Sequence, residues 1–283
     1  MLAGMAAVAG TGLLGNLAPA VACASQPTRK GRLRQSVSRW PYSKIPLAEF
    51  CDACKAMGLT AIDLLQPAEW DVVHERGLVC SMGYPTDRPD FLSNGFNNRA
   101  SHAMLIAELE RTIPLAAKRG VPNVIAMFGN RKGLSDAEGI EACSEGFKRV
   151  APVAERHGVT ICVELLNSRV DHKDYQGDHT AFGVEVMKSV GSPRVKLLYD
   201  IYHMQIMEGD VIRTIRDNIQ FIAHFHTGGV PGRHELDETQ ELNWRTVAKA
   251  IADTEFGGFV AHEFVPTRDP LTSLREAVEV CSV

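Results

Sequence analysis

The sequence has no excess of basic residues and no long run of one charge. Among its 283 residues, 30 Lys and Arg stand against 34 Asp and Glu, which gives a formal net charge of -4 at pH 7. Proteins that bind nucleic acid or anionic membranes through general electrostatics need a basic surface. We therefore expect no nucleic-acid partner and no membrane partner of this kind.

Two common cofactor and metal motifs are also missing. No G-x-G-x-x-G follows the first predicted strand, which argues against a dinucleotide site. Cys51 and Cys54 form one C-x-x-C, and without a second pair this is weak evidence for zinc. Leu47, Phe50, Cys54 and Met57 are spaced like one apolar face of a helix. We expect both thiols to pack in or beside the hydrophobic core.

Charged residues are absent from the first 26 positions. This stretch is rich in Ala, Gly and Leu and ends in Ala22-Cys23-Ala24, a pattern typical of signal-peptide cleavage sites. The positively charged start of a signal is missing, so we expect the true start codon upstream, as in a truncated twin-arginine signal. Pro19 and Asn16 interrupt the stretch, which argues against a membrane span.

We predict that residues 1–24 are the remnant of an export signal and that residues 25–283 form a single domain. The mature protein would then be periplasmic. In the alternative, residues 1–24 form a helix packed on the domain, and the protein is cytoplasmic.

The rest of the chain alternates short apolar runs with longer amphipathic segments. Helices are predicted over 101–120 and 135–158, and the second begins with Ser135 and Glu138, which are spaced as a capping box. The short apolar runs predict eight strands. Eight strands alternating with helices indicate a (β/α)8 TIM barrel, with an open doubly wound sheet as the alternative. The predicted strands are 32–38, 61–66, 78–83, 123–128, 159–166, 195–200, 221–226 and 258–264.

The last four predicted strands each carry an ionisable residue at or near the carboxyl end. These residues are Glu164, Asp200, His226 and Glu263. In a (β/α)8 barrel the carboxyl ends of the strands meet at one mouth, where active sites lie. Three adjacent carboxylates repel one another, and a divalent cation would remove that repulsion. Two Glu, one Asp and one His suit Mn²⁺ or Mg²⁺, with Co²⁺ or Zn²⁺ also possible. Salt bridges to Lys or Arg at the rim are the alternative.

Several segments resemble the hydroxypyruvate isomerase-like branch of the xylose isomerase-like TIM barrels. They are "VELLNS…DHKDYQGDHTAFG", "LLYDIYHMQIMEGD", "HFHTGGVPGRHELDETQELNW" and "GFVAHEFVPTRDP". The resemblance implies one divalent metal ion held by the four residues above, with Glu164 and Glu263 as the proton-transferring pair. It also implies that His203 and Arg233 contact substrate oxygens. Hydroxypyruvate isomerases usually carry Gln at the position of His226, whereas ketose 3-epimerases carry His.

The expected reaction is therefore an isomerisation of a small sugar or hydroxy-keto acid through a metal-stabilised enediolate. The alternatives are 3-epimerisation of a ketose, elimination of water by an inosose dehydratase-like lyase, and non-catalytic sugar binding. His234 follows Arg233 in the same loop and is a further candidate for substrate contact. We expect His224, two residues before His226, to pack deeper in the barrel or to support the site. The long loop 84–100 is expected at the catalytic mouth, and a homo-oligomer is possible.

Overall fold

The computed structural model describes Met1 and residues 31–283. Apart from Met1, the predicted export signal of residues 1–24 lies outside the described residues. All eight predicted strands are present, with ends that differ by a few residues from the predicted ones. The strands are β1 (Arg34–Ser38), β2 (Ala61–Asp63), β3 (Val79–Cys80), β4 (Asn123–Met127), β5 (Thr160–Glu164), β6 (Val195–Asp200), β7 (Ile222–Thr227) and β8 (Phe259–His262).

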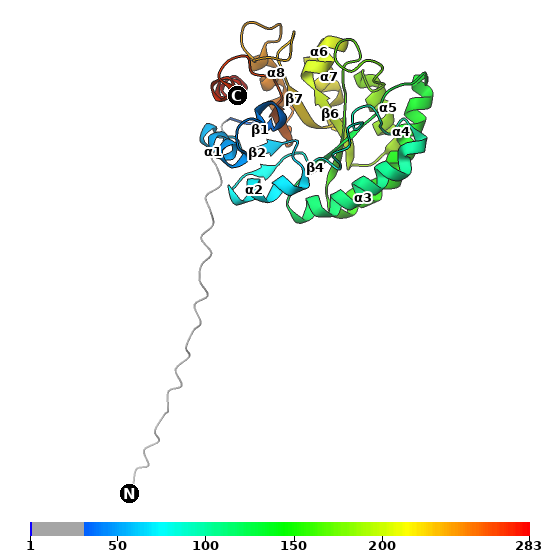
Figure 1. Ribbon diagram of the computed structural model, residues 1–283, viewed down its shortest axis with the longest axis horizontal. Helices are drawn as coiled ribbons and strands as arrows, with labels where there is room; N and C mark the ends of the chain where they lie inside the picture. The colour runs from blue at the N-terminus through cyan, green and yellow to red at the C-terminus, as the bar shows by residue number, and fades with distance from the viewer. Residues whose placement is uncertain (2–30) are drawn as a thin grey trace.

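The strands form one sheet in the order β3-β2-β1-β8-β7-β6-β5-β4, and all named neighbours are parallel. Residues just beyond β3 complete the circle, because the backbone N–H of Gly83 donates to the carbonyl of Asn123 at 2.9 Å and Ile125 donates to the carbonyl of Gly83 at 3.1 Å. The helices surround the strands (Figure 1). This arrangement confirms the predicted (β/α)8 barrel.

The helices cover the outer face of the barrel because each one carries an apolar stripe toward the strands. The α-helices are α1 (Leu47–Met57), α2 (Trp70–Glu75), α3 (His102–Lys118), α4 (Asp136–His157), α5 (Thr180–Val190), α6 (Ile201–Met207), α7 (Val211–Asn218), α8 (Trp244–Ala252) and α9 (Pro270–Cys281). Short 3₁₀ helices lie at η1 (Trp40–Tyr42), η2 (Pro67–Glu69), η3 (Arg99–Ser101) and η4 (Ile219–Phe221).

Local sequence determines the form of two helices. The short connection between β2 and β3 leaves room for only six residues in α2. Helix α4 begins with the predicted capping box, in which Ser135 and Glu138 bond each other's backbone N–H groups, and it ends at Gly158 with φ of 68°.

The core lies between the strands and the helix ring and extends into the barrel. Cys51 and Cys54 lie on α1, are fully buried and form no disulfide, as expected for core thiols. In the part of the chain that the structure describes, no helix combines the length and the apolar character needed to cross a membrane.

Candidate active site and metal centre

The four residues predicted at the strand ends converge at the mouth of the barrel. One ligand atom from each of Glu164, Asp200, His226 and Glu263 lies within 4.8 Å of all the others. The imidazole Nδ1 of His226 is 3.2 Å from Glu164 Oε1, 3.9 Å from Asp200 Oδ2 and 2.6 Å from Glu263 Oε2. All four residues are buried, with at most 5% of their surface exposed.

Asp200, at the end of β6, caps the next helix with one carboxylate oxygen and faces the cluster with the other. Helix α6 begins directly after the strand, and the Asp200 side chain is its N-cap, accepting a hydrogen bond from the backbone N–H of His203 at 3.3 Å. Its other oxygen, Oδ2, faces Arg233 at 3.0 Å and His226 at 3.9 Å. The abrupt passage from strand to helix therefore turns this carboxylate toward the cluster.

Arg233 reaches the same carboxylates from the loop after β7. Its Nη2 lies 3.0 Å from Asp200 Oδ2 and 2.6 Å from Glu263 Oε2, and its Nε donates to the backbone carbonyl of Glu263 at 3.1 Å. The backbone of Arg233 has φ of 58°, which is uncommon for a residue other than glycine. The loop thus holds the guanidinium over the carboxylates in a restricted conformation.

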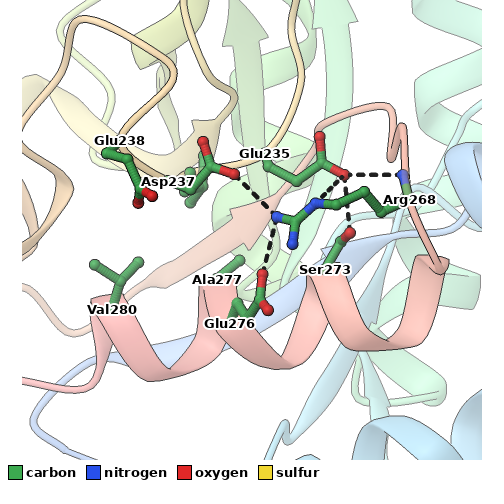
Figure 2. A pocket seen from close by; sticks show the side chains of 9 residues that line it. Glu235, Asp237, Glu238, Arg268, Ser273, Glu276, Ala277 and Val280 are labelled. Atoms are coloured by element: carbon green, nitrogen blue, oxygen red, sulfur yellow. Dashed lines mark hydrogen bonds and ion pairs between the residues drawn. The ribbon is translucent and has the colours of Figure 1, made fainter.

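Glu235 anchors this loop to the start of α9. Its carboxylate accepts hydrogen bonds from the backbone N–H of Thr267 at 2.9 Å and from Ser273 Oγ at 2.8 Å. Figure 2 shows the Glu235 carboxylate in contact with Ser273 and Arg268, and the Arg268 guanidinium bonded to Asp237 and Glu276. Burial raises the pKa of Glu235, but these hydrogen bonds outweigh it and lower the pKa to about 2. The charged carboxylate therefore fixes the segment that carries Arg233.

A cavity of about 270 Å³ opens beside the cluster. Glu164, Glu263 and Arg233 reach its wall, whereas Asp200 and His226 are not among its lining residues. The rest of the wall is mainly apolar and aromatic, and two of its members, Tyr84 and Leu92, come from the loop predicted at the mouth. The other lining residues are Trp40, Leu64, Ile125, Met127, Leu166 and His172.

Two residues predicted to contact substrate, His203 and His234, lie in different surroundings. His203 is fully buried, its Nδ1 accepts from Asn167 Nδ2 at 2.7 Å, and its Nε2 lies 3.6 Å from Asp200 Oδ2. Among the described residues, this Nε2 has no hydrogen-bond partner. His234 is exposed, and its Nδ1 lies 3.0 Å from the carbonyl of Val265. His234 is absent from the cavity wall, so its contact with substrate stays a prediction.

Three site residues were not expected from the sequence. Asp63, at the end of β2, contacts His226 Nε2 at 2.9 Å through Oδ2 and His224 Nε2 at 3.1 Å through Oδ1. Trp40 follows β1 and donates its indole N–H to Glu263 Oε1 at 2.6 Å. His172 lines the cavity with its ring centroid 5.2 Å from that of His203. The signal for Asp63 was present, because it is an acidic residue at the end of an apolar strand.

Burial and neighbouring charges shift the pKa values of the ionisable groups of the site in opposite directions. Burial raises the pKa of Asp200 to about 7, with Arg233 opposing the shift and Glu263 adding to it. Burial also acts to raise the pKa of Glu263, but Arg233 and His226 outweigh it and lower that pKa to about 2. Burial disfavours the charged form of His226, yet Glu263 and Asp63 hold its pKa well above the usual value.

The donor set fits a divalent cation. Three carboxyl groups face one guanidinium and one imidazole here, and burial raises the pKa of Asp200 even though Arg233 and His226 act to lower it. Carboxylate oxygens with one imidazole nitrogen suit Mn²⁺ or Mg²⁺, and a bound cation would favour the ionised carboxylates. Glu164, Asp200, His226 and Glu263 are therefore the residues that could hold a metal.

The comparison with protein families agrees with this geometry. The model of the xylose isomerase-like TIM barrel family matches residues 24–282. The chain belongs to this family. The resemblance seen in the sequence motifs is thereby confirmed, and the barrel mouth described above lies where enzymes of this fold class have their active sites.

Two curated relatives of this chain are named for different activities. A human protein named "Putative hydroxypyruvate isomerase" is 25% identical over 240 residues, covering 83% of this chain and 80% of its own. The D-psicose 3-epimerase of Agrobacterium fabrum is 28% identical over 207 residues, covering 68% of this chain and 67% of its own.

One similar solved structure is an AP endonuclease, family 2, from Brucella melitensis, with a TM-score of 0.77 and 23% identity over 86% of this chain and 97% of that one. At this identity the structural likeness shows the fold alone. The sequence relatives support an isomerase or epimerase, and the chain is an enzyme of that kind.

Proposed function

We propose that this xylose isomerase-like protein is a metal-dependent isomerase that moves a proton next to a carbonyl group. Its substrate is a small hydroxy-carbonyl compound, either of the hydroxypyruvate and tartronate semialdehyde type or a ketose. One observation carries the proposal. Of the four clustered residues, only Glu164 and Glu263 reach the cavity wall, whereas Asp200 and His226 lie behind them.

This division gives Glu164 and Glu263 contact with the substrate as well as with the metal, and leaves Asp200 and His226 as metal ligands only. Glu164 ends β5 and Glu263 follows β8, and β6 and β7 lie between these two strands, so the carboxylates face a bound molecule from different sides. One carboxylate takes the proton from carbon and an acid returns it to the neighbouring carbon. A divalent cation on Glu164, Asp200, His226 and Glu263, with Mn²⁺ or Mg²⁺ favoured, would polarise the carbonyl and stabilise the enediolate.

Arg233 at the cavity wall and His203, which is buried behind it, would hold the substrate. Arg233 faces the cavity with a guanidinium whose charge is permanent, so it can bind a carboxylate or a hydroxyl oxygen. His203 is a neutral donor, because burial and Arg233 lower its pKa well below the usual value and its Nδ1 already accepts from Asn167. Its Nε2–H is directed to the side of Asp200, where a substrate oxygen near the cation would lie.

The cavity also supports a second candidate, 3-epimerisation of a ketose. Its volume of about 270 Å³ corresponds to about nine water molecules at ~30 Å³ each. That space exceeds the need of a three-carbon keto acid, and Trp40 and Tyr84 give it aromatic walls. Epimerisation uses the same two carboxylates, one to remove the proton and one to return it to the opposite face of the same carbon.

The test is solvent exchange at the substrate carbon. The protein is loaded with Mn²⁺ and incubated in deuterated water with hydroxypyruvate and, separately, with D-fructose and D-psicose. Deuterium incorporation and product identity are read by mass spectrometry and NMR. We expect isomerised product with label. A 3-epimer with label would favour the second candidate, and loss of water would indicate a lyase.

The two glutamates are tested with Glu164→Gln and Glu263→Gln at saturating metal. Each variant should keep the fold and lose turnover by a factor of about 10² or more, the usual scale for a positioned acid or base. Glu276→Gln is the matched control, because Glu276 is a carboxylate on α9 that pairs with Arg268 outside the cavity. Wild-type exchange rates in both site variants would rule out the two-glutamate mechanism. Tight sugar binding without any turnover would make the chain a binding protein.

A further inference from the structure

A buried carboxylate lies directly beneath the candidate metal centre. Asp63 is fully inaccessible, and its two oxygens face two histidines of β7. Oδ2 is 2.9 Å from His226 Nε2, and Oδ1 is 3.1 Å from His224 Nε2. Ser81 Oγ donates a hydrogen bond to Oδ1 at 2.5 Å. Asp63 does not line the cavity, so it acts through its neighbours and not on the substrate.

The contact with Asp63 decides which nitrogen of His226 faces the carboxylates. An aspartate accepts hydrogen bonds, so His226 Nε2 carries a proton. The other nitrogen, Nδ1, then points to Glu164 at 3.2 Å and to Glu263 at 2.6 Å. Once its own proton is released, Nδ1 offers a lone pair to a cation among these carboxylates.

We propose that Asp63 is a positioning residue that makes His226 a metal ligand through Nδ1. This inference rests on the proposed metal-dependent function. A histidine that binds a metal through one nitrogen commonly donates its other N–H to a carboxylate, which fixes the ring and raises its basicity. Asp63 supplies that carboxylate from β2, across the barrel from β7.

An amide in place of the Asp63 carboxylate would change the surroundings of both histidines. Asp63 faces the Nε2 atoms of both His224 and His226, one with each oxygen. Asn offers one acceptor oxygen and one donor NH₂, so it can accept from only one of the two imidazoles. Asp63→Asn therefore preserves the shape of the side chain and removes the charge and one of the two acceptor oxygens.

The experiment measures metal binding and the His226 proton separately from activity. Mn²⁺ affinity and stoichiometry are determined by calorimetry for wild type, Asp63→Asn and Ser81→Ala. Ser81→Ala is the matched control, because it removes a buried hydrogen bond to Asp63 and leaves both histidine contacts. We expect one ion per chain, about 10- to 100-fold weaker binding in Asp63→Asn, and near wild-type binding in Ser81→Ala.

The proton on His226 Nε2 is read by NMR in the metal-free wild type and both variants. A slowly exchanging, low-field Nε2–H signal, assigned by its absence in His226→Gln, should be present in wild type and in Ser81→Ala and lost or shifted in Asp63→Asn. The NMR measurement needs no metal, so it tests the contact between Asp63 and His226 even if the wild-type protein binds no metal and the proposed function is wrong. Wild-type Mn²⁺ affinity in folded Asp63→Asn would overturn the inference. Two ions in wild type and one in the variant would do so too, because Asp63 would then be a ligand itself.

Discussion

Asp200 shows how one residue serves the fold and the site at once. It ends β6, caps α6 through the backbone N–H of His203, and turns its second oxygen toward Arg233 and His226. Burial raises its pKa to about 7, so the metal-free protein holds a carboxyl group that is only partly ionised at neutral pH. The raised pKa should therefore appear in the pH dependence of the free energy of unfolding.

Asp200 should make the metal-free protein less stable as pH rises from about 4 to about 7. In this window the unfolded chain has lost the Asp200 proton, whereas the folded chain, with its raised pKa, retains it. The folded state thus binds more protons, and the free energy of unfolding falls by up to about 1.4 kcal/mol per pH unit from this residue. Asp200→Asn should remove this slope.

Denaturant unfolding of wild type and Asp200→Asn across this pH range, with chelator present, measures the difference. The comparison is needed because His203 and His262 contribute the opposite slope in both proteins. Burial lowers the pKa of His203 well below its usual value and that of His262 to about 3, so both are neutral when folded and gain protons on unfolding. Identical pH slopes in the two proteins would contradict the assignment. With Mn²⁺ present, the same variant should bind the ion more weakly, because it lacks one ligand charge.

At the scale of secondary-structure elements, barrel closure depends on a short segment after β3. Gly83 bonds the backbones of Asn123 and Ile125 and so joins this segment to β4. It also lies against a tryptophan of α2, because a Cβ added at Gly83 would come within 2.6 Å of Trp70 Cζ2. Real Cβ atoms do not approach so closely, so the contact requires glycine.

Gly83→Ala should lower the free energy of unfolding by about 1–3 kcal/mol, the usual cost of overpacking a filled core. Gly257→Ala is the matched control, since a Cβ there meets no atom within 4 Å. Thermal and denaturant unfolding of both variants, and of Gly83→Ala combined with Trp70→Phe, measure the effect. A cost for Gly83→Ala that is no larger than for Gly257→Ala would show that the closure tolerates a side chain.

At the scale of the whole molecule, the first and last residues of the described barrel lie next to each other. The backbone N–H of Arg32 donates to the carbonyl of Val283 at 2.8 Å. All eight strands and the candidate site lie within residues 31–283. The export signal stays a prediction from the uncharged, Ala-rich segment before them.

We predict that the mature protein starts near Ser25 and that residues 1–24 add nothing to the stability of the barrel. N-terminal sequencing of the protein from its native host identifies the start. Thermal unfolding of chains that begin at Met1 and at Ser25 should give the same midpoint. An uncleaved chain whose midpoint falls on removal of residues 1–24 would favour the alternative of a packed N-terminal helix.

Most of the fold follows from local patterns that the sequence displays directly. Short apolar runs, the Ser135–Glu138 capping box and the glycine at position 158 depend on neighbours a few residues away. Strand ends are less exact, as in β2, which was expected over 61–66 and spans Ala61–Asp63. There the sheet contacts, and not the apolar run, decide where the strand stops.

The convergence of Glu164, Asp200, His226 and Glu263 was also predictable, because parallel strands in a barrel bring their carboxyl ends to one mouth. The sequence by itself determined the barrel, the end at which these four groups meet and their chemical character. Tertiary structure alone decided that Asp63 contacts His226, that Arg233 turns into the cluster and that His234 is exposed. The physical reason is distance along the chain, since Asp63 and His226 are 163 residues apart and meet only when the barrel forms.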